Sequence, residues 1–123
     1  MLLERVDSLR KALEPIERRA LASMSTTADT DALEAAKSAL LPEIDAATIV
    51  VMLEGPAKIT EQAMRIGHAL RAWGEVLEVL VRTVLADDPE AEAGKVAVRS
   101  VSQEAGEAVG VFLLSARKHL DKA

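Results

Sequence analysis

The feature that most constrains this chain is a set of apolar residues that recurs every three or four positions between residues 59 and 84. Steps that alternate between four and three keep side chains on one stripe of an α-helix, and this 3.5-residue period is typical of a helical-bundle seam. The stripe consists of Ile59, Ala63, Ile66, Leu70, Trp73, Leu77, Leu80 and Val84. Such a stripe needs other helices to cover it, so the sequence predicts an all-α protein.

Three further segments carry a stripe of the same kind, in residues 2–24, 32–54 and 88–122. The chain has 123 residues, which is the length of one ordinary domain and too short for two. Four helical segments joined by short links are typical of an up-down bundle. We therefore predict a four-helix up-down bundle in which residues 1–123 form a single domain.

Prolines interrupt the first two predicted helices, at Pro15 and Pro42. A proline inside a helix removes one backbone donor and crowds the carbonyl four residues before it. We therefore expect these helices to be kinked or split at the two prolines. Asp31, followed three residues later by Glu34, indicates a capping box that opens the second helix.

The end of the second helix is its most apolar part, since residues 48–53 read Thr-Ile-Val-Val-Met-Leu. A strand here would have no other strand to pair with, so we predict that this run is helical and buried. Gly55 is expected to end the helix in a left-handed conformation.

Gly67 and Gly74 lie on the same flank of the third helix. Because glycine has no side chain, we predict that a neighbouring backbone packs closely against this flank. A similar track of small residues on the last helix is formed by Ser102, Gly106 and Gly110.

Composition excludes several classes of function. The formal net charge is -5 with scattered basic residues, and aromatic residues make up 2% of the chain. Nucleic-acid binding needs a basic surface and aromatic stacking platforms, so we expect no nucleic-acid partner. The chain has no cysteine and no apolar run near the ~20 residues of a membrane span, and its first residues do not resemble a signal peptide. We expect a cytoplasmic protein without a cofactor.

Several aliphatic residues fall outside the predicted core. Projection at 100° per residue places Val111 and Leu114 on the outer side of the last helix, and Met64 and Val79 on that of the third. Exposed apolar residues on two neighbouring helices are typical of a contact surface. The main functional prediction is therefore a non-enzymatic protein–protein interaction or self-association module, with a homodimer as the expected form.

A histidine on the third helix supports a second hypothesis. Residues 65–71 read Arg-Ile-Gly-His-Ala-Leu-Arg, with His68 on the outer face. This string resembles the histidine phosphotransfer domain pattern, in which an exposed bundle histidine is followed by leucine, lysine and glycine. Arg71 replaces the lysine and Ala72 the glycine. The resemblance implies that His68 accepts a phosphoryl group beside Arg71.

Two pairs of glutamates support a third hypothesis. They are Glu75 with Glu78 and Glu104 with Glu107. Carboxylates three positions apart share a helix face, and two such pairs on adjacent helices can hold Mg²⁺ against phosphates. These pairs are similar to those of the MazG-like all-α nucleotide pyrophosphohydrolases, which implies Mg²⁺-dependent cleavage of nucleoside triphosphates. Gly74 stands where that family usually has a further acid, and Glu107 where it usually has aspartate.

Overall fold

The computed structural model describes the backbone of residues 2–122 and the side chains of residues 2–118. The chain forms four helices, α1 (Leu2–Leu21), α2 (Thr27–Glu54), α3 (Ala57–Leu85) and α4 (Ala91–Lys122). The described residues contain no strand, and the helices begin and end within a few residues of the predicted segments. The prediction of an all-α four-helix bundle is confirmed.

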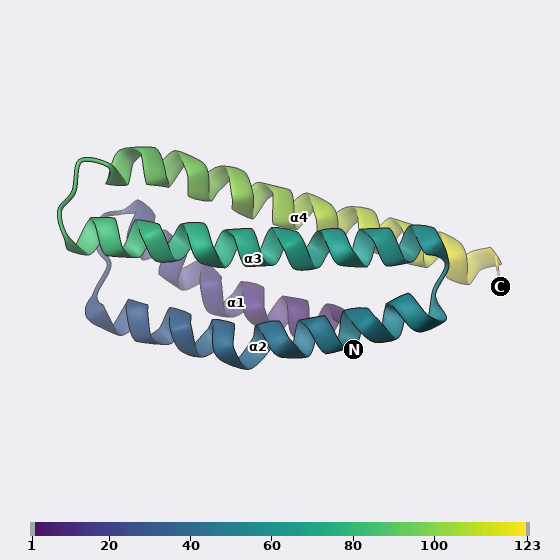
Figure 1. The fold of residues 1–123 in the computed structure, drawn as a ribbon. Coiled ribbons are helices and arrows are strands. Elements are labelled where there is room, and N and C mark those ends of the chain that lie inside the picture. Colours follow the sequence, from purple (N-terminus) through teal and green to yellow (C-terminus); the bar gives the residue numbers. More distant parts are fainter. Residues whose placement is uncertain (1, 123) are drawn as a thin grey trace.

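The central helix of the bundle is α3. Figure 1 shows α2, α3 and α4 side by side in one layer, with α1 crossing diagonally behind it and consecutive helices running in opposite directions. Helix α3 packs along both α2 and α4, whereas α1 packs chiefly against α2 and meets α4 least of all. The seam between α1 and α4 is therefore the weakest of the bundle.

The predicted stripe of α3 forms the core. Its six central members, from Ala63 to Leu80, are at most 2% exposed, and Ile59 and Val84 at its ends are half-buried. Trp73 also has a polar contact, because its indole Nε1 donates a hydrogen bond to Glu17 Oε1 of α1 at 3.2 Å. Burial raises the pKa of the Glu17 carboxyl above its ordinary value.

Neither proline splits its helix, because α1 continues through Pro15 and α2 through Pro42. Figure 1 shows α2 changing direction near its middle, which fits the kink that we expected there. Residues on both sides of each proline are buried in the core, Leu13 and Ile16 in α1 and Leu41 and Ile44 in α2. Their burial keeps the helices continuous despite the missing backbone hydrogen bond.

The second helix begins at Thr27, earlier than the predicted capping box at Asp31. The observed box uses Asp29, whose Oδ2 accepts a hydrogen bond from the backbone nitrogen of Thr26 at 3.0 Å. The Asp29 side chain is only 4% exposed, and its oxygens also accept hydrogen bonds from Arg19 Nε at 2.9 and 3.1 Å. Asp29 is thus held by Arg19 of α1, whereas Asp31 is exposed. The helix therefore begins at the residues that Asp29 caps.

The left-handed residues are not where the sequence predicts them. Gly55 is extended, with φ -97° and ψ 162°, because Pro56 forces the residue before it out of the helical region. The positive φ angles belong instead to Ser23 at 56° and Asp87 at 52°, which follow the ends of α1 and α3. At each of these positions the positive φ turns the chain away from the helix. The backbone nitrogens that follow the helix still donate hydrogen bonds to carbonyls of its last turn.

The apolar run at the end of α2 is helical as predicted, but the prediction that it is buried is wrong for four of its six residues. Ile49, Val50, Met52 and Leu53 are 46–81% exposed. Ile49 and Met52 line the groove between α2 and α3, away from α1, whereas Val50 lies on the side of α2 that meets α1. Leu2, at the start of α1, lies beside Val50, so α1 does not extend over the turns of α2 that follow.

Asp87→Gly is expected to raise the free energy of unfolding by about 0.5–1 kcal/mol, because glycine adopts a positive φ without steric strain. Urea denaturation followed by circular dichroism measures the change. Ala86→Gly is the matched control, since Ala86 has φ -83° and glycine there only adds freedom to the unfolded chain. A loss of stability in Asp87→Gly would contradict the expectation.

Asp29 is expected to make the fold sensitive to acid. Its hydrogen bond from Arg19 holds the pKa of Asp29 below the ordinary 3.8, so the ionised carboxylate stabilises the fold at neutral pH, and this contribution is lost as the pH falls through the lowered pKa. Asp29→Asn should lower the free energy of unfolding by about 1–3 kcal/mol at pH 7. It should also reduce the loss of stability between about pH 5 and pH 2.

Urea denaturation at several pH values measures both effects. Asp31→Asn, two residues away on the exposed side of the same helix, is the control and should leave stability nearly unchanged. An acid dependence that is the same in Asp29→Asn and in the unaltered chain would refute the role of this carboxylate.

Candidate interaction surface

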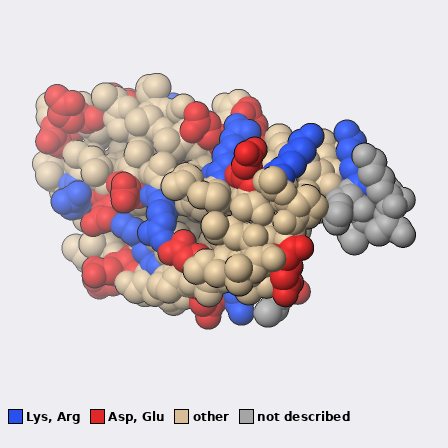
Figure 2. Space-filling model, turned by 45° about the vertical axis from the view of Figure 1, so that its right-hand side comes forward, with Lys and Arg blue, Asp and Glu red and all other residues tan. Residues whose placement is uncertain are grey.

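Exposed aliphatic side chains gather at the end of the bundle that carries the α2–α3 turn. Twelve large apolar side chains are exposed among the described residues, and eight of them, 38–81% exposed, lie at this end. We call them the turn-end surface: Ile49, Val50, Met52 and Leu53 of α2, Met64 of α3, and Val111, Leu113 and Leu114 of α4. Figure 2 shows a broad uncharged area on this side of the molecule, with acidic and basic groups at its borders.

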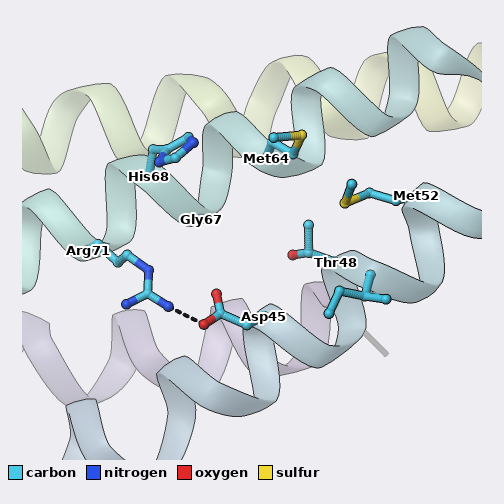
Figure 3. Close-up of a pocket in the computed structure, with 8 residues that line it drawn as sticks. Asp45, Thr48, Met52, Met64, Gly67, His68 and Arg71 are labelled. Carbon is cyan, nitrogen blue, oxygen red and sulfur yellow. Dashed lines mark hydrogen bonds and ion pairs between the residues drawn. The ribbon is translucent and has the colours of Figure 1, made fainter.

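A shallow groove between α2 and α3 forms part of this surface. Its volume is about 260 Å³, and its apolar part is lined by Ile49 and Met52 from α2 and Met64 from α3. Figure 3 shows Met52 and Met64 on opposite sides of the groove, and an ion pair between Arg71 and Asp45 at one end of it. An apolar floor with flexible methionine walls suits aliphatic side chains of varied shape.

The exposed residues of α4 form a ridge on the other side of α3. The two helices are in contact at Gly94 of α4, where an added Cβ would lie 3.2 Å from the Leu80 side chain of α3. Counting along the antiparallel helices from this contact places Val111 at the level of Ala63. The ridge of α4 and the groove beside Met64 therefore flank the same part of α3.

The structure brings together three of the four predicted interface residues. Met64, Val111 and Leu114 lie at the turn end, whereas Val79 is exposed fifteen residues further along α3, about 22 Å away at 1.5 Å per residue. The sequence interpretation missed the residues of α2, because it placed their whole run in the core. Five consecutive apolar residues, 49–53, surround a helix on all sides, and this signal already implies that some of them face outward.

The predicted close approach of backbones at Gly67 and Gly74 is wrong. A Cβ added at Gly67 would meet nothing within 4 Å, and one at Gly74 would meet the aliphatic part of Lys37 at 3.5 Å instead of a backbone. The long side chain of Lys37 fills the space between α2 and α3. Gly110 on α4 also faces open space, whereas a Cβ added at Gly94 would press on the Leu80 side chain.

His68 is exposed at the edge of the groove, as the phosphotransfer hypothesis requires. Figure 3 shows Arg71 directed away from this histidine and toward Asp45 of α2, with which it forms an ion pair. In the histidine phosphotransfer pattern the basic residue lies beside the histidine. Phosphoryl transfer to His68 stays a prediction.

The four glutamates of the pyrophosphohydrolase hypothesis do not form one cluster. Glu78 accepts a hydrogen bond from Lys37 Nζ at 2.7 Å, which lowers the pKa of its carboxyl, and Glu75 is exposed on the outer face of α3. Glu104 and Glu107 are exposed on α4 at the level of residues 67–70 of α3. Within the side chains that the structure describes, no three acids or histidines lie where they could share a metal ion. Binding of Mg²⁺ by these residues stays a prediction.

Comparison with protein-family models, with curated proteins and with solved structures found no match for this chain. None of the helices, as far as the structure describes them, has an apolar stretch long enough to cross a bilayer. The function therefore has to be inferred from the turn-end surface itself.

Gly110→Ala is expected to raise the free energy of unfolding by about 0.5–1 kcal/mol, because alanine is the better helix former and its Cβ would enter open space. Gly94→Ala is the control and should lower the free energy of unfolding, since its Cβ would press on Leu80. Urea denaturation of both variants provides the measurement. A destabilised Gly110→Ala would show that a neighbour packs against α4 at this position.

Proposed function

We propose that this chain is a non-enzymatic helical-bundle module that associates with a protein partner through the turn-end surface, and that the partner is a second copy, giving a homodimer. The mode is helix-on-helix burial of aliphatic side chains. The observation that carries the proposal is the concentration of eight exposed aliphatic residues at one end of a bundle whose buried apolar residues form a single core.

The size of the surface supports association. The largest apolar patch on a monomeric protein is typically about 300–600 Å². Eight aliphatic side chains with exposed fractions between 38% and 81% present an area on the order of several hundred Å². A two-fold dimer buries the same patch on both copies, which approaches the roughly 1,200–2,000 Å² of a stable interface.

The competing hypotheses have less support from the geometry. Arg71 is paired with Asp45 and not with His68, and Glu78 is paired with Lys37. The cytoplasmic location expected from the sequence stays a prediction alongside the interaction function.

Leu114→Glu and Met52→Glu are expected to weaken association by at least tenfold, because each would place an unpaired carboxylate in an apolar interface. Light scattering after size exclusion, over a range of protein concentrations, gives the molar mass and the dissociation constant. Circular dichroism should show the helical content unchanged, since both side chains are exposed in the monomer.

Val96→Glu is the matched control, because Val96 is also an exposed aliphatic residue of α4 but lies far from the turn end. It should leave the dissociation constant unchanged. A chain that remains monomeric at high concentration, or a dimer that both substitutions leave intact, would refute self-association through this surface.

A further inference from the structure

The outward face of α2 is uncharged. Positions along it that recur every three or four residues are apolar and exposed, and we call them the outer stripe of α2: Ala28, Ala32, Ala35, Ala39, Pro42, Ala46, Val50 and Leu53. The corresponding outward positions of α1 are residues 4, 7, 11, 14 and 18, which are all exposed and all charged. A helix at the surface normally has polar residues opposite its buried stripe, whereas a helix that is apolar on opposite faces is typical of one covered on both.

The outer stripe has the length of a contact between two helices. Figure 1 shows α2 at the edge of the layer, and no other helix of the described chain lies beyond it. Projection at 100° per residue places the stripe opposite the buried Leu33 and Ile44. From Ala28 to Leu53 it extends about 38 Å at 1.5 Å per residue, which is the scale of a long helix rather than of a small ligand.

At its large end the outer stripe borders an apolar groove between α2 and the start of α1. The groove has a volume of about 270 Å³, and its apolar lining includes Leu2 of α1 and Ala46 and Val50 of α2. Leu53, 81% exposed, follows one turn after Val50. Large aliphatic side chains of a partner helix can enter this groove, and the alanines further along α2 let the partner's backbone approach closely.

The charges beside the outer stripe are negative. The exposed charged residues of α2 are all acidic, namely Asp31, Glu34, Glu43 and Glu54. The only basic residue of the helix, Lys37, is directed toward α3 and paired with Glu78. Glu43 is paired with Arg5 of α1 at 3.5 Å, but the other three form no ion pair with a described side chain. These acids favour a partner with positive charges beside its apolar residues.

The same acids disfavour two other occupants. A pair of α2 helices from two copies would gather the acids of both around one contact, with no exposed basic residue from either helix. An anionic membrane surface would be repelled for the same reason.

We propose that the outer stripe of α2 docks an amphipathic helix of another protein, whose aliphatic residues recur every three or four positions and are flanked by lysine or arginine on both sides. The proposal goes beyond self-association and does not depend on it. The outer stripe shares only Val50 and Leu53 with the turn-end surface, and its other members extend toward the opposite end of the bundle.

A synthetic helix serves as the probe for this site. It is a fluorescently labelled peptide of about 24 residues, with leucines every three or four positions and lysines on both flanks. Fluorescence anisotropy should show one peptide bound per chain, and the affinity should fall as salt is added. Two matched peptides, one with glutamate for each lysine and one with serine for each leucine, should not bind.

Substitutions in the outer stripe locate the contact. Ala39→Arg and Ala46→Arg should each raise the dissociation constant of the lysine peptide at least about tenfold, because each places a long, positively charged side chain in the contact. Val96→Arg is the matched control, since it adds the same charge at an exposed position of α4, and should change the dissociation constant less than about twofold. Circular dichroism should show unchanged helical content, because all three side chains are exposed.

The outcomes separate this site from the proposed self-association. Weakened binding in both α2 variants but not in Val96→Arg supports the site. Absence of binding to the unaltered chain, or equal weakening in all three variants, overturns it. A changed molar mass of peptide-free Ala39→Arg would show that a second copy occupies the stripe, which also overturns it. Leu114→Glu should weaken self-association and change peptide binding less than about twofold, so either proposal can fail while the other stands.

Discussion

Burial of the apolar stripe of α3 is the interaction on which the rest of the structure depends. α3 packs along both α2 and α4 and also contacts α1, and its central residues from Ala63 to Leu80 are almost completely excluded from water. Each fully buried aliphatic side chain contributes roughly 1.5–3 kcal/mol, which is large against the usual net stability of a domain. The layer of α2, α3 and α4 therefore holds together through its middle member.

Unequal helix lengths leave one side of α2 uncovered at the turn end. α1 has 20 residues and crosses the layer diagonally, whereas α2 and α4 have 28 and 32. At the opposite end, α1 and α4 are linked by a hydrogen bond from Lys95 Nζ to Ser23 Oγ at 2.7 Å, but toward the α2–α3 turn Gly110 faces open space. Val50, which lies beside the start of α1, is exposed there, whereas Ile49, Met52 and Met64 are exposed along the groove between α2 and α3.

The sequence predicted which stripe of each helix is buried, but not where a neighbouring helix stops. Spacing alone assigns Ile66, Leu70 and Leu77 to the core, and all three are fully buried, because helical periodicity is a local property of the chain. The burial of Ile49, Val50, Met52 and Leu53 is predicted wrongly, because their exposure depends on how the neighbouring helices lie against α2 and not on local spacing.

The same distinction applies to the candidate site and to the helix ends. Met64, Val111 and Leu114 could be identified because outward projection is also local, whereas the groove beside Met64 requires the register of α2 against α3. At Gly55 two local preferences conflict. A glycine after a helix usually adopts a left-handed conformation, but the following Pro56 favours an extended one, and Gly55 is extended. Asp29 caps the second helix in place of the predicted Asp31, because Asp29 also accepts a hydrogen bond from Arg19, which lies on another helix.

The hydrogen bond between Trp73 and Glu17 has a practical consequence. Trp73 is the only tryptophan in a chain without tyrosine, so the near-ultraviolet emission of the protein comes from one indole. That indole lies where α1 meets α3, and its partner is a carboxyl whose pKa is raised by burial. Fluorescence thus reports the docking of the shortest helix directly, and detachment of α1 can be followed optically without any added label.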